Sequence, residues 1–161
     1  VVEVMGRHAG YLALYVGISV GATAVLIPER ELDFERDVVE KIRRARLAGT
    51  THYMVVVAEG AGNTMDISRR IHEEIGIDPR VTVLGHIQRG GAPSSRDRET
   101  ASRMGYEAVK AIAENQGNCV VSTQEGHLVI LEMEEALKMS KNFQMDRYQI
   151  LEALTNNCGA I

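Results

Sequence analysis

The stretch Val83-Leu84-Gly85-His86-Ile87-Gln88-Arg89-Gly90-Gly91 runs from a short apolar strand into a histidine, an arginine and two glycines. Glycines let the backbone approach a ligand closely, and a guanidinium group forms strong charge-assisted hydrogen bonds to oxyanions. A strand that ends in this way indicates an anion-binding edge, and phosphate is the anion that fits it best.

The residues on either side of this stretch alternate short apolar runs with longer amphipathic ones. Their periods predict strands over residues 1–5, 23–27, 53–58 and 81–84, and helices over residues 10–20, 34–47 and 64–75. The second helix has Asp33 as its predicted N-cap and Gly49 as its C′ residue. After Gly91 the pattern predicts a helix over residues 97–115, strands over 119–122 and 127–131, and helices over 132–138 and 145–154. Strands that alternate with helices favour a mainly parallel sheet, whose ligands gather at the carboxyl ends of the strands.

The composition is that of an ordinary soluble domain. The chain has 161 residues, of which 45% are hydrophobic and 25% charged, and its net charge is −4. A negative balance argues against a nucleic-acid surface, which needs a basic face. The apolar runs have the length of strands, so we expect no membrane span and a cytoplasmic protein. Cys119 and Cys158 lack the spacing of metal ligands, and we expect both to be free thiols.

The chain begins inside a predicted strand, on Val1. Either the numbering starts after processing, or the chain is the C-terminal part of a longer polypeptide whose earlier strands lie outside it. We favour the second interpretation.

Two further strand ends carry residues that could contact a ligand. The first strand is followed by Met5-Gly6-Arg7-His8-Ala9-Gly10, where a glycine turn, an arginine and a helix N-terminus favour an anion. The alternative is a tight turn with a solvated arginine. The third strand ends at Glu59 before Gly60, and this carboxylate could accept sugar hydroxyls or brace an arginine. Alternatively, it complements the dipole of the next helix.

Arg80 lies before the fourth strand, whereas His86 and Arg89 follow it. Six extended residues span roughly 20 Å, so one phosphate cannot contact both ends within a subunit. We therefore expect Arg80 either to reach a site on a neighbouring chain or to be a surface residue. The spacing of the other histidines does not suit a metal site, and we expect no zinc at His8, His52, His72 or His127.

Taken together, these segments resemble the C-terminal half of bacterial ATP-dependent 6-phosphofructokinases. The resemblance rests on Met5-Gly6-Arg7, Glu59, Arg80, the 83–91 stretch and Ala101-Ser102-Arg103-Met104-Gly105, in order and with matching spacing. It implies an incomplete three-layer α/β fold, a mainly parallel sheet flanked by helices. Residues 1–87 and 139–161 would form the substrate-binding domain. Residues 88–138 would pack onto an N-terminal nucleotide domain that this chain lacks.

The resemblance also implies a reaction and the residues that serve it. The family transfers the γ-phosphoryl group of MgATP to fructose 6-phosphate in glycolysis and forms fructose 1,6-bisphosphate. Glu59 would hold sugar hydroxyls, His86 and Arg89 would hold the 6-phosphate, and Arg80 would reach into the adjacent subunit of a homo-oligomer, expected to be a tetramer. The expected substrate contacts are Met5, Gly6, Arg7, Glu59, Arg80, His86, Ile87, Gln88 and Arg89. ATP, Mg²⁺ and the catalytic aspartate would belong to the missing half, so we expect this chain alone to be inactive.

Allosteric control is expected to be weak. The resemblance assigns an effector site to Gly21, Ala22, Thr23, Thr50, Thr51 and His52. Regulated relatives carry an acidic residue at the position of Thr23 and lysines at those of Ala48 and Thr50. Without these charges, we expect ADP to activate weakly or not at all.

Two other functions stay open. A pyrophosphate-dependent phosphofructokinase would differ mainly in the missing half, although His86 favours the ATP-dependent type. A non-catalytic fragment would keep the same residues without activity. Dinucleotide binding is disfavoured, because no Gly-x-Gly-x-x-Gly follows the first strand.

Overall fold

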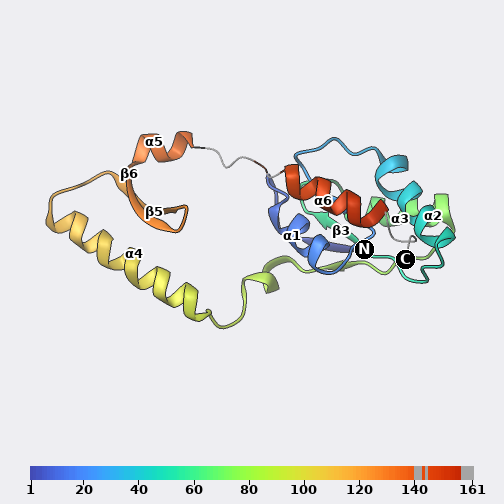
Figure 1. The fold of residues 1–161 in the computed structure, drawn as a ribbon, viewed down its shortest axis with the longest axis horizontal. Helices are drawn as coiled ribbons and strands as arrows, with labels where there is room; N and C mark the ends of the chain where they lie inside the picture. The colour runs from blue at the N-terminus through green and yellow to red at the C-terminus, as the bar shows by residue number, and fades with distance from the viewer. Residues whose placement is uncertain (140–142, 144, 157–161) are drawn as a thin grey trace. The chain divides into compact units, whose positions relative to one another are not determined.

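A computed structural model describes residues 1–139, 143 and 145–156 of the chain. Its elements are shown in Figure 1. The chain divides into two compact units, one formed by Val1–Gly90 with the described residues from Phe143 onward, the other by the described residues after Gly90 and before Phe143. The sequence predicted domain boundaries after residues 87 and 138, and the structure has the first one after Gly90. The parts of the predicted C-terminal segment at 140–142, 144 and 157–161, which include Cys158, lie outside the described residues.

The first unit is built on a parallel sheet. Its strands are β1 (Val2–Val4), β2 (Ala24–Leu26), β3 (Val55–Ala58) and β4 (Thr82–Val83), in the order β2-β3-β1-β4. Val2 lies opposite Val56 and Thr82, and Ala24 lies opposite Val55. This arrangement confirms the mainly parallel sheet expected from the alternation of strands and helices. It also brings the carboxyl ends of β1 and β3 side by side.

Helices cover both faces of this sheet. They are α1 (Tyr11–Ser19), α2 (Glu40–Leu47), α3 (Thr64–Ile75) and α6 (Met145–Asn156), with a π-helical turn, η1 (Glu35–Val39), before α2. Successive strand residues point to opposite faces, so Val56 and Ala58 pack with α1 and α6, while Val55 and Val57 pack with α2 and α3. A sheet that is buried on both faces needs continuous apolar strands, which explains the all-buried Val55–Ala58. The unit has the predicted three layers.

The second predicted helix is confirmed in position but not in geometry. Its predicted N-cap is confirmed, because the Asp33 carboxylate accepts a hydrogen bond from the Arg36 amide at 3.1 Å. Gly49 has φ +85°, as expected after a helix C-terminus. The π-helical turn was not predicted. Residues in α- and π-helical turns occupy the same φ/ψ region, so local propensity does not distinguish them.

The second unit contains one long helix, a hairpin and a short helix. The helix α4 (Ser95–Ala113) starts at a capping box in which Ser94 and Asp97 satisfy each other's backbone amides. The antiparallel strands β5 (Cys119–Gln124) and β6 (His127–Glu132) follow, and α5 (Met133–Lys138) comes next. Their turn has Glu125 and Gly126 at positive φ. No helix among the described residues is both long and apolar enough to span a bilayer.

Candidate functional site

The loop after β1 and the loop after β3 lie side by side at the carboxyl edge of the sheet. Val4 pairs with Ala58, and the Glu59 amide continues this pairing by donating to the Val4 carbonyl at 2.9 Å. The Gly60 amide then donates to the Gly6 carbonyl at 3.3 Å. The structure therefore brings together two of the segments singled out in the sequence.

Glycine is required on both sides of this contact. A Cβ atom on Gly60 would lie 1.9 Å from the Arg7 carbonyl oxygen. Gly6 has φ +143°, and its Cβ would lie 2.4 Å from the Ala9 carbonyl oxygen. The two loops can approach only because Gly60 has no side chain, and the loop after β1 can adopt its own turn only because Gly6 has none. The side chains of Arg7 and Glu59 remain exposed at this edge.

The quoted stretch of the sequence joins the same edge through a turn. The strand predicted over residues 81–84 is shorter than expected, since β4 ends at Val83 and Leu84 already has helical φ/ψ angles. Gly85 then has φ +52° and opens a 3₁₀ turn, η2 (Gly85–Arg89). Within η2 the Gln88 side-chain oxygen accepts a hydrogen bond from the Met5 amide at 2.8 Å.

The positions of the residues in η2 indicate different tasks. Gln88 is half-buried, and its side-chain oxygen accepts the hydrogen bond from the Met5 amide, so it fixes the turn against the loop after β1. His86 and Arg89 are exposed, as is Ile87. An imidazole and a guanidinium that are free to face solvent at a glycine-rich strand end suit an anion.

Arg80 lies at the other end of the strands. Its carbonyl accepts a hydrogen bond from the Val1 amine at 2.8 Å, whereas Gln88 contacts Met5. Val1 and Met5 are about 13 Å apart along β1 at 3.3 Å per residue. The predicted separation of roughly 20 Å between Arg80 and His86 is an overestimate, because the chain stops being extended at Leu84. Arg80 and His86 nevertheless lie at opposite ends of the parallel strands.

The predicted effector residues meet at the same amino edge as Arg80. The Thr23 amide donates to the Met54 carbonyl at 2.8 Å, and the Met54 amide donates to the Thr23 hydroxyl at 3.3 Å. Gly21 has φ +61° at the end of α1, and Ala22 is buried. Beside these segments lies a cavity of about 730 Å³, whose polar lining includes Arg46, Thr51, His52 and Arg80. Thr50 precedes this lining, and its carbonyl accepts from the Tyr53 hydroxyl.

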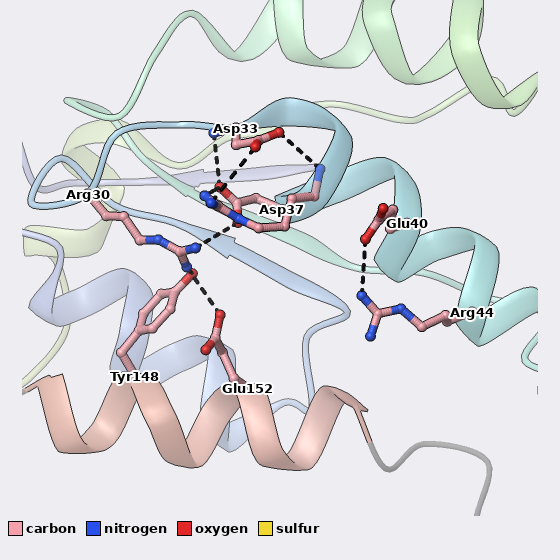
Figure 2. A network of polar contacts seen from close by, with 8 residues as sticks. Arg30, Asp33, Asp37, Glu40, Arg44, Tyr148 and Glu152 are labelled. Carbon is pink, nitrogen blue, oxygen red and sulfur yellow. Dashed lines mark hydrogen bonds and ion pairs between the residues drawn. The ribbon is translucent and has the colours of Figure 1, made fainter.

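An ionic cluster that the sequence did not reveal joins α6 to η1. The Arg30 guanidinium contacts the Asp37 carboxylate at 3.2 Å, the Tyr148 hydroxyl at 2.5 Å and the Glu152 carboxylate at 3.1 Å (Figure 2). Arg36 pairs with Asp37 at 2.8 Å. Burial raises the pKa of Asp37, but the hydrogen bond from Arg36 and the neighbouring positive charges outweigh it, so the pKa lies below its ordinary value.

Lys41 lies close to this cluster and is buried. Among the described residues its amino nitrogen has no hydrogen-bond partner. Burial lowers the pKa of Lys41, and the opposing charges of Glu152 and Asp37 compensate only in part. The cluster is therefore a structural one, and the Lys41 amine beside it has no hydrogen-bond partner among the described residues.

The described residues do not form a metal site. No group of three or more histidine, cysteine, aspartate or glutamate side chains in that part of the chain could hold a metal ion. The exposed guanidinium and imidazole groups of Arg7, Arg89 and His86 have the chemistry to bind a small phosphorylated ligand. Sequence reasoning missed one residue at this edge, Glu29, whose carboxylate accepts hydrogen bonds from the Gly10 amide.

Comparisons with known proteins agree with this geometry. The family model for phosphofructokinase matches residues 1–112. The chain is 45% identical over 155 residues to ATP-dependent 6-phosphofructokinases of Bacillus cytotoxicus and Bacillus thuringiensis, covering 96% of this chain and 48% of each relative. It thus spans about half the length of these curated relatives.

Two solved structures have the same fold. Phosphofructokinase from Pichia pastoris in the T-state aligns with a TM-score of 0.73 and 34% identity, over 99% of this chain and 18% of that one. Phosphofructokinase from Saccharomyces cerevisiae aligns with a TM-score of 0.76 and 32% identity, over 99% of this chain and 22% of that one. These likenesses confirm the expected fold class.

Proposed function

Because the chain belongs to the phosphofructokinase family, we propose that it is the sugar-phosphate-binding portion of an ATP-dependent 6-phosphofructokinase. Such an enzyme phosphorylates fructose 6-phosphate to fructose 1,6-bisphosphate in glycolysis, and we place it in the cytoplasm. One observation carries the proposal. The loop after β1, the loop after β3 and η2 converge on one edge of the sheet, tied by the Gly60–Gly6 and Met5–Gln88 hydrogen bonds.

The residues at this edge have the chemistry that a sugar phosphate requires. Arg89 and His86 are donors for the 6-phosphate, while the Glu59 carboxylate accepts hydrogen bonds from sugar hydroxyls. Arg7 adds a second fixed positive charge beside Gly60. These groups bind and orient the acceptor sugar, and orientation accounts for much of phosphoryl-transfer catalysis. When bound, MgATP supplies the transferred phosphoryl group, and its ligands belong to residues outside this chain.

Arg80 completes the proposal. It lies at the opposite edge of the sheet from His86 and Arg89, so it serves the substrate site of a neighbouring subunit in a homo-oligomer, for which we propose a tetramer. The second unit, with exposed Tyr106, Val109 and Ile112 along α4, packs onto the nucleotide-binding portion of the enzyme.

Steady-state kinetics of the complete natural protein that contains this chain test the proposal. Each charge-assisted hydrogen bond to phosphate contributes about 1.5–3 kcal/mol, so R89A should raise the KM for fructose 6-phosphate about 10- to 150-fold and leave the KM for ATP nearly unchanged. R69A, at an exposed arginine of α3 that pairs with Asp66 and Glu73 of its own helix, is the matched control and should change neither constant.

Other results would contradict the proposal or redirect it. Turnover with pyrophosphate but not with ATP would indicate the pyrophosphate-dependent type. A chimera in which this chain replaces the matching segment of the Bacillus cytotoxicus relative separates an inactive fragment from a working half-site. No binding of fructose 6-phosphate by either protein would refute the proposed function.

A further inference from the structure

We propose that Glu29 is a positioning residue of the sugar-phosphate site. It comes from the loop after β2 and anchors the far end of the loop after β1, defined here as Met5–Gly10. In this way it holds Arg7 in place to meet the substrate. The inference rests on the proposed function, because it concerns the same site.

The contact between Glu29 and Gly10 is close and specific. The Gly10 amide donates to both carboxylate oxygens of Glu29, at 2.8 and 3.0 Å. Gly10 is buried, and a Cβ atom on it would lie 2.4 Å from the Ile27 side chain and 2.8 Å from Glu29. Glycine at this position is therefore what allows the carboxylate to reach the backbone.

The contact with Glu29 also provides a substitute for the N-terminal side-chain cap that α1 lacks. Gly10 is the N-cap of α1, and the described structure has neither a side-chain cap there nor an acidic residue in the first turn. In a capping box, a carboxylate three residues into the helix accepts from the N-cap amide. Ala13 occupies that position here. Glu29, which is 19 residues farther along the chain, accepts the hydrogen bond from the N-cap amide instead, and its negative charge suits the positive end of the helix dipole.

Glu29 completes a set of anchors around the loop. The Met5 amide is held by Gln88, the Gly6 carbonyl by Gly60, and the Gly10 amide by Glu29. Arg7 and His8 are exposed between these anchors. A short loop with a glycine at φ +143° has considerable conformational freedom, so its shape depends on being held at both ends.

The turn that carries Glu29 is itself rigid. Ile27 is buried, and Pro28 has a restricted φ angle. On the other side, Arg30 is held by Asp37 and Tyr148. Glu29 is thus presented from a well-supported position, as a residue that aligns another segment must be. It acts through Arg7 and does not itself need to touch the sugar.

The test compares E29A, E29Q and the control E31A in the complete natural protein. Glu31 is an exposed glutamate two residues farther along the chain. E29A leaves a buried amide without an acceptor, so we expect the KM for fructose 6-phosphate to rise about tenfold with the KM for ATP unchanged. Hydrogen–deuterium exchange over residues 6–10 should become faster. E29Q keeps one carbonyl oxygen and should show a rise of about threefold, while E31A should match the wild type.

The outcomes separate this inference from the proposed function. A residue that only stabilises α1 would lower the Tm of E29A and leave its KM for fructose 6-phosphate within twofold of the wild type, and that result would overturn the inference. Should E29A fail to fold, E29Q decides in the same way, because a wild-type KM in E29Q also overturns it. A wild-type protein that does not bind fructose 6-phosphate refutes the proposed function itself, and with it the role of Glu29 toward this substrate.

Discussion

Replacing Gly60 by alanine should separate the two loops that form the candidate site. The added Cβ would lie 1.9 Å from the Arg7 carbonyl oxygen and 2.6 Å from its carbonyl carbon. Both contacts are with backbone atoms, which cannot move aside as a flexible side chain can. To restore ordinary contact distances, the loops must move apart by about 1 Å or more.

The cost follows from this displacement. Overpacking of this kind destabilises by about 1–3 kcal/mol, and loss of the Gly60–Gly6 hydrogen bond adds about 1 kcal/mol. We expect G60A to lower the free energy of unfolding by about 2–4 kcal/mol. A displacement of about 1 Å at a substrate-orienting loop can cost a factor of about 100, so the KM for fructose 6-phosphate should rise by one to two orders of magnitude.

Urea unfolding and steady-state kinetics of the complete protein measure the two effects. G76A is the matched control, because Gly76 follows α3 in the first unit and a Cβ there would meet no described atom within 4 Å. Its φ of +72° should cost alanine about 1–2 kcal/mol of stability, while the KM for fructose 6-phosphate should stay unchanged. A G60A variant with the stability and KM of the wild type would refute the reasoning, since the loops would then not need to touch.

Three further predictions concern the ionic cluster and the amino edge. D37N should lower the free energy of unfolding in urea by about 2–3 kcal/mol. Because the pKa of Asp37 in the folded protein lies below its ordinary 3.8, the stabilisation by this carboxylate should be complete above about pH 4 and disappear as the pH falls through the folded-state pKa. If D37N lost stability in acid as the wild type does, the assignment would be contradicted. K41M should raise the Tm and the free energy of unfolding, the latter by about 1–2 kcal/mol, since it removes a buried amine that has no partner among the described residues. Because the pKa of Lys41 is lowered, the stability of the wild type should also rise with pH up to about 10.5, and K41M should lack this rise. K110M, at an exposed lysine, should change neither the Tm nor the dependence of stability on pH. ADP should activate the complete enzyme less than twofold, because Thr23 and Thr50 offer no charge, and strong activation in an effector titration would show that other residues bind it.

Local sequence signals predicted most of the elements of the fold. The helix α3 begins and ends where its period predicts, because Asn63 caps its first amides and Gly76 follows it at φ +72°. The buried strand Val55–Ala58 could be found in the same way, since a sheet covered on both faces requires an uninterrupted apolar run. Where local signals are weak, the prediction was less accurate, as at β4, which contains two residues where four were predicted.

The sequence alone determined the order of the elements, the parallel sheet, the glycines at its carboxyl edge and the family to which the chain belongs. Periodicity and turn chemistry act between near neighbours, so they can be read without a structure. Only the tertiary structure decided which residues hold the site together. Gln88 and Met5 are 83 residues apart, Glu29 and Gly10 are 19 apart, and Arg30 and Tyr148 are 118 apart. A carboxylate or an amide oxygen can accept from any exposed donor, and its partner is chosen only when packing brings one donor within reach and buries it.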